Sequence, residues 1–207
     1  MKGRTLLLLA VWLFLVVAGT LFVLRAVEKR AAMERQVSEA RQRAEEAVAA
    51  LQERLKSELT AAMQQGGPAA ALRVCAESAQ PLTEDFRGEA GFPVGRTALR
   101  LRNPANAPGP LAEEWMRRVG VQTSAAAPVE PAVKVEEFLD GDRLLHYWQP
   151  IYVQPQCLPC HGMPEQIPAE VADLLAERYP EDRATGFAAG DFRGIFWAQV
   201  PLPKIEG

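Results

Sequence analysis

Residues 133–161 are VKVEEFLDGDRLLHYWQPIYVQPQCLPCH, and the fold class follows from this stretch and its flanks. Val133–Leu139 and Leu144–Val153 are rich in β-branched, aromatic and leucine side chains, which favour strands. Asp140-Gly141-Asp142 lies between them and has the composition of a turn. The pattern predicts a β-hairpin that leads directly into a Cys-x-x-Cys-His sequence.

Helices are predicted on both sides of this hairpin, with one more strand near the C-terminus. Upstream we expect a short helix over Pro68–Gln80, an ordered loop with one short strand over Pro81–Pro110, a short helix over Leu111–Val119 and a surface connection over Ser124–Pro131. Downstream we expect a helix over Pro168–Arg178 and a strand over Phe192–Val200. Because the elements do not alternate as β-α-β units, the predicted class is α+β with an antiparallel sheet.

The N-terminus predicts a membrane anchor. Lys2 and Arg4 precede an uncharged, mostly apolar run from Thr5 to Leu24, and Arg25 follows it. This run is about 20 residues long, which is enough to cross a hydrocarbon core. A cleaved signal peptide is the alternative, but a small-x-small cleavage site does not close the run clearly. We therefore assign residues 1–25 to a transmembrane signal-anchor.

A long helix is predicted directly after the anchor. Residues 26–65 contain neither Gly nor Pro, and their apolar side chains, Ala44, Val48, Leu51, Leu55, Leu59 and Ala62, recur at helical spacing. This stripe fits either a homodimer through the long helix or packing against the helix's own domain. Gly66-Gly67 ends the helix, and Pro68 can begin the next one. The remaining residues, 66–207, form the folded domain.

Composition excludes some classes of protein. The 207 residues carry a formal net charge of -3, so binding to nucleic acid has no electrostatic support. Three cysteines are too few for a disulfide framework in a chain of this length. Cys157 and Cys160 form a pair, and Cys75 remains to be explained.

Cys157-Leu158-Pro159-Cys160-His161 has the pattern of covalent c-type haem attachment. Two thiols at this spacing can form thioethers to the two haem vinyl groups, and His161 is then placed as an axial iron ligand. The rival interpretations are a zinc site completed by His146 or Cys75, a thioredoxin-like pair, and a chance match. The export signal upstream favours one covalent haem c. Because c-type attachment occurs outside the cytoplasm, we expect the domain on the periplasmic side of the inner (cytoplasmic) membrane.

The second axial position has several candidates. They are Cys75, His146 and the methionines Met63, Met116 and Met163. Met163 is too close to His161 in sequence to reach the opposite haem face. His146 is expected to face solvent from its strand, and a lone cysteine such as Cys75 is most often a small buried hydrophobe.

The C-terminal two-thirds of the chain resembles a family of single-haem c-type proteins with a PAS-like domain. The resemblance is carried by Arg96–Pro108, Tyr147–Pro150, Cys157–Gly162, Tyr179–Phe187 and Gly190–Gly194. It implies a PAS-like central antiparallel sheet flanked by helices. It also implies an unusual His/Cys pair of axial ligands, in which Cys75 occupies the place of the family's cysteine.

Four arginines are candidates to pair with the haem propionates, because guanidinium groups bind carboxylates in a bidentate manner. They are Arg96, Arg100, Arg102 and Arg193. The alternative for each is a surface or structural role.

Two functions follow from these features. The first is a redox or diatomic-gas sensor domain, in which loss of Cys75 from the iron moves its helix and signals to a partner protein. The second is a membrane-anchored monohaem electron carrier that serves a redox partner. We expect no enzymatic activity, since Glu113-Glu114 and Glu136-Glu137 have the pattern of solvated faces.

Overall fold

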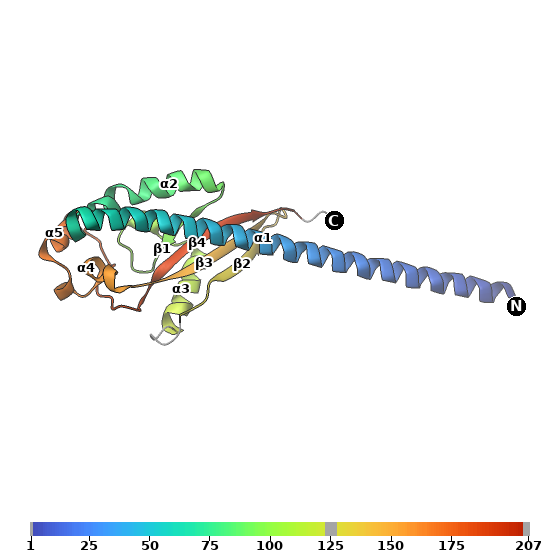
Figure 1. Cartoon of the computed structure of the whole chain (residues 1–207). Coiled ribbons are helices and arrows are strands. Elements are labelled where there is room, and N and C mark those ends of the chain that lie inside the picture. The colour runs from blue at the N-terminus through green and yellow to red at the C-terminus, as the bar shows by residue number, and fades with distance from the viewer. Residues whose placement is uncertain (1, 123–127, 205–207) are drawn as a thin grey trace.

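The computed structural model describes residues 2–122 and 128–204. Its elements in chain order are α1 (Lys2–Glu77), α2 (Ala79–Ala90), β1 (Val94–Thr97), α3 (Pro110–Gln122), β2 (Ala132–Glu137), β3 (Arg143–Tyr152), α4 (Leu158–His161), α5 (Ala169–Arg178) and β4 (Phe192–Leu202) (Figure 1). Short 3-10 turns cover Pro104–Asn106, Pro155–Cys157 and Pro164–Gln166. The predicted α+β class and the long helix that precedes the domain are confirmed.

The sheet is antiparallel, with strand order β1-β4-β3-β2. The predicted hairpin is present, because β2 pairs with β3 from Ala132↔Trp148 to Glu137↔Arg143. Its turn contains Gly141 with a φ of 80°, a left-handed conformation that glycine adopts at little cost. The last strand in sequence, β4, lies in the middle of the sheet and pairs with both β1 and β3.

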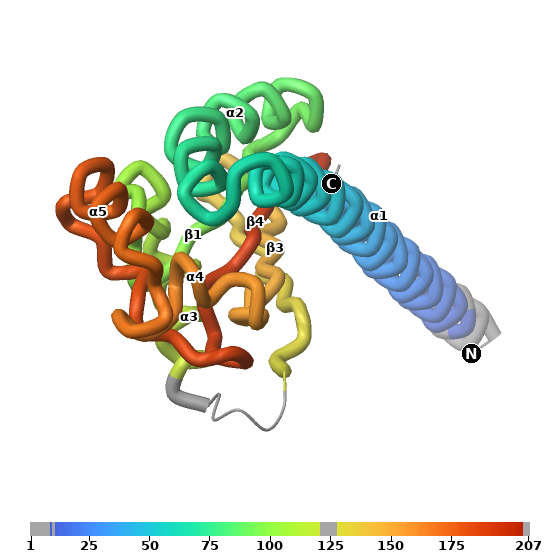
Figure 2. Tube along the Cα trace, turned by 60° about the vertical axis from the view of Figure 1, so that its left-hand side comes forward, coloured from blue at the N-terminus to red at the C-terminus, as the bar shows by residue number. Residues whose placement is uncertain are grey.

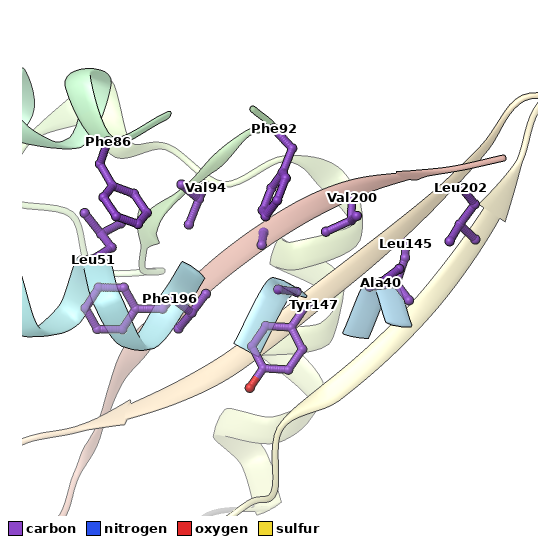
Figure 3. Packing of buried hydrophobic residues seen from close by; sticks show 13 residues of the cluster. Ala40, Leu51, Phe86, Phe92, Val94, Leu145, Tyr147, Phe196, Val200 and Leu202 are labelled. Atoms are coloured by element: carbon purple, nitrogen blue, oxygen red, sulfur yellow. The ribbon is translucent and has the colours of Figure 1, made fainter. Parts of the chain in front are cut away.

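Helices cover both faces of the sheet, which gives the PAS-like arrangement. On one face, α1 and α2 pack against the strands through a core that includes Leu51, Phe86, Leu145, Tyr147 and Phe196 (Figure 3). On the other face, α3 packs through Trp115, Met116 and Val119 against Trp148 and Ile195.

The apolar stripe of α1 packs against the helix's own domain. Ala44, Val48 and Leu51 are fully buried in the core shared with the sheet. This contact corresponds to the second of the two alternatives for the stripe. A homodimer through the exposed faces of the helix stays a prediction.

The break in α1 falls at the predicted glycines. Gly66 has φ -153° and ψ 20°, and Gly67 has φ 69° and ψ -164°, so neither residue is helical. We call residues 68–77, which continue as helix beyond this break, the distal arm.

At its N-terminal end, α1 has an apolar segment that is long enough to span a membrane. The rest of the protein buries none of the most apolar part of this segment.

A loop was predicted from Pro81, but residues 79–90 form α2. Pro81 is tolerated because it lies in the first turn, where backbone N–H groups have no partner within the helix, and burial of Phe86 and Thr83 stabilises the helix. The predicted connection over residues 124–131 lies partly outside the described residues, because residues 123–127 are not described.

Candidate functional site

The Cys-x-x-Cys-His sequence forms a compact turn at the end of the sheet where the distal arm lies (Figure 2). Cys157 closes the 3-10 turn Pro155–Cys157, and α4 carries Cys160 and His161. Residues three apart in helical turns lie on the same side, so the two thiols face a common region. Both are half-buried, and neither forms a disulfide.

The ring of His161 is held by a backbone carbonyl far away in sequence. Its Nδ1 lies 2.6 Å from the oxygen of Ala184 and therefore donates its proton there. Burial lowers the pKa of His161 to about 3, and the charges of Arg102 and Arg193 act in the same direction. The ring is consequently neutral at pH 7, with Nδ1 protonated and the lone pair on Nε2. This is the form in which a histidine binds a metal.

The segment around Ala184 is attached to the motif by backbone hydrogen bonds. Gly186 donates its N–H to the carbonyl of Gly162 at 2.7 Å, and Phe187 donates to the carbonyl of His161 at 3.0 Å. Asp182 Oδ1 accepts the N–H of Ala184 at 2.7 Å. The position of the Ala184 carbonyl, and with it the orientation of His161, is therefore set by several contacts.

Arg102 and Asp182 form a buried ion pair beside the motif. Nη2 of Arg102 lies 3.0 Å from Oδ2 of Asp182, and the two side chains are only 12% and 10% exposed. The same Nη2 donates to the carbonyl of Cys160 at 2.5 Å. Arg102 therefore joins α4 to the Asp182–Phe187 segment, which is the structural alternative allowed for this arginine.

Arg100 and Arg193 lie against Phe187. The guanidinium carbon of Arg100 is 4.1 Å from the ring centroid, and that of Arg193 is 5.4 Å away. Arg100 donates to the carbonyls of Arg183 and Thr185, and Arg193 donates to the carbonyl of Arg100. Burial lowers the pKa of Arg193 to about 10, with the charges of Arg102 and Arg96 adding to the effect. Arg193 is still a cation at pH 7.

The arginines leave a positive region next to the motif. Arg96, Arg102 and Arg193 all act electrostatically on His161, and Asp182 pairs with one of them. Desolvated like charges repel each other, so this region favours an anionic group. The carboxylates of a haem would supply such charge.

Cys75 lies in the same region. Burial raises the pKa of its thiol, whereas Arg96 and Arg102 lower it. The pKa of Cys160 is also raised, chiefly by burial, and Cys75 contributes to the shift. The fold therefore brings Cys75 within electrostatic reach of the motif, although 82 positions separate it from Cys157 in the sequence.

The proximity of Cys75 to the motif depends on the packing of the distal arm against α5. A small apolar cluster joins the two, and it consists of Ala69, Leu72, Val171, Leu174 and Leu175, with Cys160, Ile167 and Tyr179 at its margin. At its edge, Arg178 donates to Glu77 at 3.3 Å. Cys75 and Cys160 are distant in sequence, so this packing is what brings them together.

His146 corrects one prediction. It was expected to face solvent, but it is buried: its Nε2 lies 3.0 Å from Oε2 of Glu136, and its Nδ1 lies 3.4 Å from the side-chain amide of Gln199. The reason is that β3 is an inner strand with helices over both faces, so neither face is open to water. Glu136, expected on a solvated face, is half-buried in this pair. His146 therefore does not join the cysteines in a zinc site.

The methionines are placed away from the positive region or at its margin. Met116 is buried in the cluster under α3, and Met63 lies on α1 before the glycine break. Met163 follows the motif and is 45% exposed. Of the candidate second ligands, Cys75 is the one whose charge acts on Cys160.

Sequence reasoning assigned no role to Asp182, Ala184 or Phe187. Asp182 could have been sought as the carboxylate that a buried arginine needs. The role of Ala184 rests on its backbone carbonyl, for which a sequence carries no signal. Phe187 takes its role from the two arginines stacked on it, which come from distant segments.

The fold and site together define a PAS-like α+β domain on a long N-terminal helix, with a Cys-x-x-Cys-His site and a third cysteine beside it. Residues 26–201 match the model of the Tll0287-like family, and the chain belongs to that family. A similar solved structure is described as the crystal structure of the cyanobacterial heme-protein Tll0287. The two chains are 27% identical with a TM-score of 0.55, over 76% of this chain and 94% of the other. No curated protein matches the chain.

Proposed function

We propose that this protein is a membrane-anchored c-type haem protein whose domain lies outside the cytoplasm and responds to redox state or to a diatomic gas. One haem would be held covalently by Cys157 and Cys160, with His161 as an axial ligand. The observation that carries this proposal is the neutral His161 ring, oriented by Ala184 next to two free thiols. The family match and the heme-protein neighbour support it.

The residues around the site suit a haem in two respects: they offer the appropriate ligands, and their positive charge complements the haem propionates. When bound, the haem supplies a one-electron iron centre whose potential depends on its ligands and on nearby charge. Arg96 and Arg193 are the arginines best placed to balance its propionates, because Arg102 is already paired with Asp182. Arg100 stacks on Phe187 and donates to the carbonyl of Arg183, so its guanidinium group is already engaged within the protein.

Cys75 is proposed as the second axial ligand. Burial favours its neutral thiol, whereas Arg96 and Arg102 favour its thiolate. These opposing effects leave the protonation of Cys75 sensitive to the charge of the site. A thiolate in this position stabilises ferric iron relative to ferrous iron, and its protonation would release the distal arm.

The connection from Cys75 to the membrane is what favours a sensor. The distal arm joins the main part of α1 at Gly66 and Gly67, and α1 continues as one helix to the apolar N-terminal segment. A movement of the arm would be passed to this helix and then to a signalling partner. Anchoring in the inner membrane, with the domain in the periplasm, is part of this proposal.

A monohaem electron carrier is the second candidate. It is favoured by the packing of the distal arm, because the apolar cluster with α5 and the contacts of Glu77 and Arg73 to that helix hold Cys75 in place. An arm that stays packed in both redox states would suit outer-sphere transfer to a redox partner. We propose no catalytic role.

The attachment is tested with denaturing gels stained for covalently bound haem. Wild type and Cys75→Ala should stain, and the double variant Cys157→Ser, Cys160→Ser should not. A double variant that still carries covalent haem would contradict attachment through these residues.

The second ligand and the function are tested by absorption and EPR spectra of the wild type and Cys75→Ala in both redox states. If the ferric spectrum is the same in both proteins, Cys75 is not a ligand of the iron. If reduction changes the axial ligation of the wild type, the sensor is supported. If the cysteine-ligated spectrum persists after reduction, the carrier is supported instead.

A further inference from the structure

The tip of the β2–β3 hairpin presents apolar side chains to solvent. Phe138 is 44% exposed, and Leu139 is 110% exposed, which is more than in an extended reference chain. On the adjoining edge strand, Val133 and Val135 are each 37% exposed. The exposed part of these side chains contributes little to the stability of the domain itself, because stabilisation follows the apolar area removed from water.

The hairpin tip points toward the N-terminal end of α1. Arg143, at the start of β3, donates to Gln36 at 3.2 Å, and Gln149 donates to Gln52 at 3.2 Å. Strand and helix therefore run side by side in the same direction. The turn Phe138–Asp142 precedes Arg143, so it lies on the anchor side of Gln36, as the arrangement in Figure 1 also indicates.

The distance from the tip to the end of the apolar segment is short. Leu24 and Gln36 are separated by about 18 Å along the helix at 1.5 Å per residue. The turn extends about 7 Å beyond Arg143 toward the anchor, at about 3.3 Å per strand residue. The backbone of the tip is thus about 11 Å from the level of Leu24. The side chain of Leu139 and a helix tilt of about 20° bring it into the headgroup layer, which is about 5–8 Å thick.

The charges on α1 also favour a contact with the lipid headgroup layer. Between Arg25 and Arg35 the helix carries four basic and two acidic side chains. Basic side chains at this level are complementary in charge to the phosphates of lipid headgroups. At the tip, the carboxylate of Asp142 is paired with Lys204 at 3.0 Å, which reduces its repulsion from an anionic surface.

We infer that the tip of the β2–β3 hairpin, Phe138–Asp142, contacts the lipid headgroup layer and fixes the tilt of the domain on its anchor. The inference rests on the proposed membrane anchor and adds a second contact to it. A second copy of the chain is a poorer occupant, because the outward side chains of α1 near this level, such as Arg35 and Glu39, are charged and exposed. Two side chains at a hairpin tip are also far less than the roughly 800 Å² per partner of a stable interface.

The test uses the full-length holoprotein in lipid nanodiscs with one copy in each disc. Leu139→Trp is made in a Trp12→Phe background, and its fluorescence is compared between ordinary lipids and lipids brominated near the headgroup end of the acyl chain. Trp115, Trp148 and Trp197 remain in every variant, so the signal of the Trp12→Phe protein alone is subtracted. Leu59→Trp in the same background is the control, since Leu59 is exposed on α1 far from the anchor. The difference between the wild type and the Trp12→Phe protein gives the signal of Trp12, which reports separately on the anchor.

Bromination should quench the tryptophan at position 139 roughly twofold and leave the one at position 59 unchanged. If Trp12 is quenched but the tryptophan at 139 behaves like the control, the hairpin contact is overturned and the anchor stands. If Trp12 itself is not quenched, the anchor proposal fails first. A second preparation contains two copies in each disc and no brominated lipid. If the fluorescence of the tryptophan at position 139 changes there relative to discs with one copy, the tip contacts a second copy and the inference is overturned.

Discussion

Nδ1 of His161 lies 2.6 Å from the carbonyl oxygen of Ala184, 23 positions further along the chain. The contact selects the tautomer in which Nε2 is free to bind a metal. Asp182 supports it twice, through the N–H of Ala184 and through Arg102. The orientation of the His161 ring therefore depends on the carboxylate of Asp182, which acts through Ala184 and Arg102.

Asp182→Asn should destabilise the domain by about 2–4 kcal/mol, because it leaves the charge of Arg102 buried without its partner. It should also raise the reduction potential of the proposed haem, since a negative charge beside the site is lost. Chemical denaturation and redox titration measure the two effects. Glu113→Gln, which breaks the exposed pair with Arg117, is the control and should cost less than about 1 kcal/mol. Equal losses in both variants would contradict a special role for the buried pair.

Arg96→Gln should weaken the retention of the Cys75 thiolate. The positive charge of Arg96 lowers the pKa of the Cys75 thiol, so its removal raises that pKa. On acidification, the spectral signature of the thiolate ligand should disappear at a higher pH in the variant than in the wild type. Arg118→Gln removes the same charge from an exposed position on α3, outside the distal arm and α5, and serves as the matched control. An identical pH midpoint in all three proteins would show that the charge of Arg96 does not act on the Cys75 thiolate.

Tyr147 should make the domain sensitive to alkaline pH. Burial raises the pKa of its hydroxyl to about 12 in the folded protein, against 10 in the unfolded chain. An acid whose folded pKa is raised contributes its full stability below the unfolded value and loses it as pH rises toward the folded value. The free energy of unfolding should therefore fall between about pH 10 and pH 12. Tyr147→Phe should flatten this decline in denaturation curves; an unchanged decline would assign it to other groups.

Gly67→Ala should strain the junction between α1 and the distal arm. With φ 69° and ψ -164°, Gly67 has a conformation that is essentially restricted to glycine, so alanine should cost about 1–3 kcal/mol. The space around Gly67 is open, which leaves backbone strain as the cause. Gly88→Ala in α2 is the control, because it also points into open space but has helical surroundings and should stabilise by about 0.5–1 kcal/mol. Denaturation checks both values, and a shift in the axial-ligand spectrum of Gly67→Ala alone would connect the junction to Cys75.

Much of the fold could be predicted from the sequence because its signals are local. The hairpin follows from two β-rich runs around Asp140-Gly141-Asp142, and the end of the long helix follows from Gly66-Gly67. Helix α2 was missed because Pro81 and Gly88 oppose helix formation locally, whereas burial of Phe86 favours it only in the assembled core. His146 was misplaced for a similar reason, since its exposure depends on α3 covering the second face of the sheet.

The sequence by itself determined the candidates for the site: the spacing of Cys157, Cys160 and His161, the single additional Cys75, and the apolar segment that precedes them. The tertiary structure alone decided how these residues are used. It placed Cys75 beside Cys160, paired Arg102 with Asp182, and directed the Ala184 carbonyl at His161. The physical reason is that residue type and spacing act over a few positions, whereas burial, charge neighbours and hydrogen bonds to distant backbone arise only when the chain is packed.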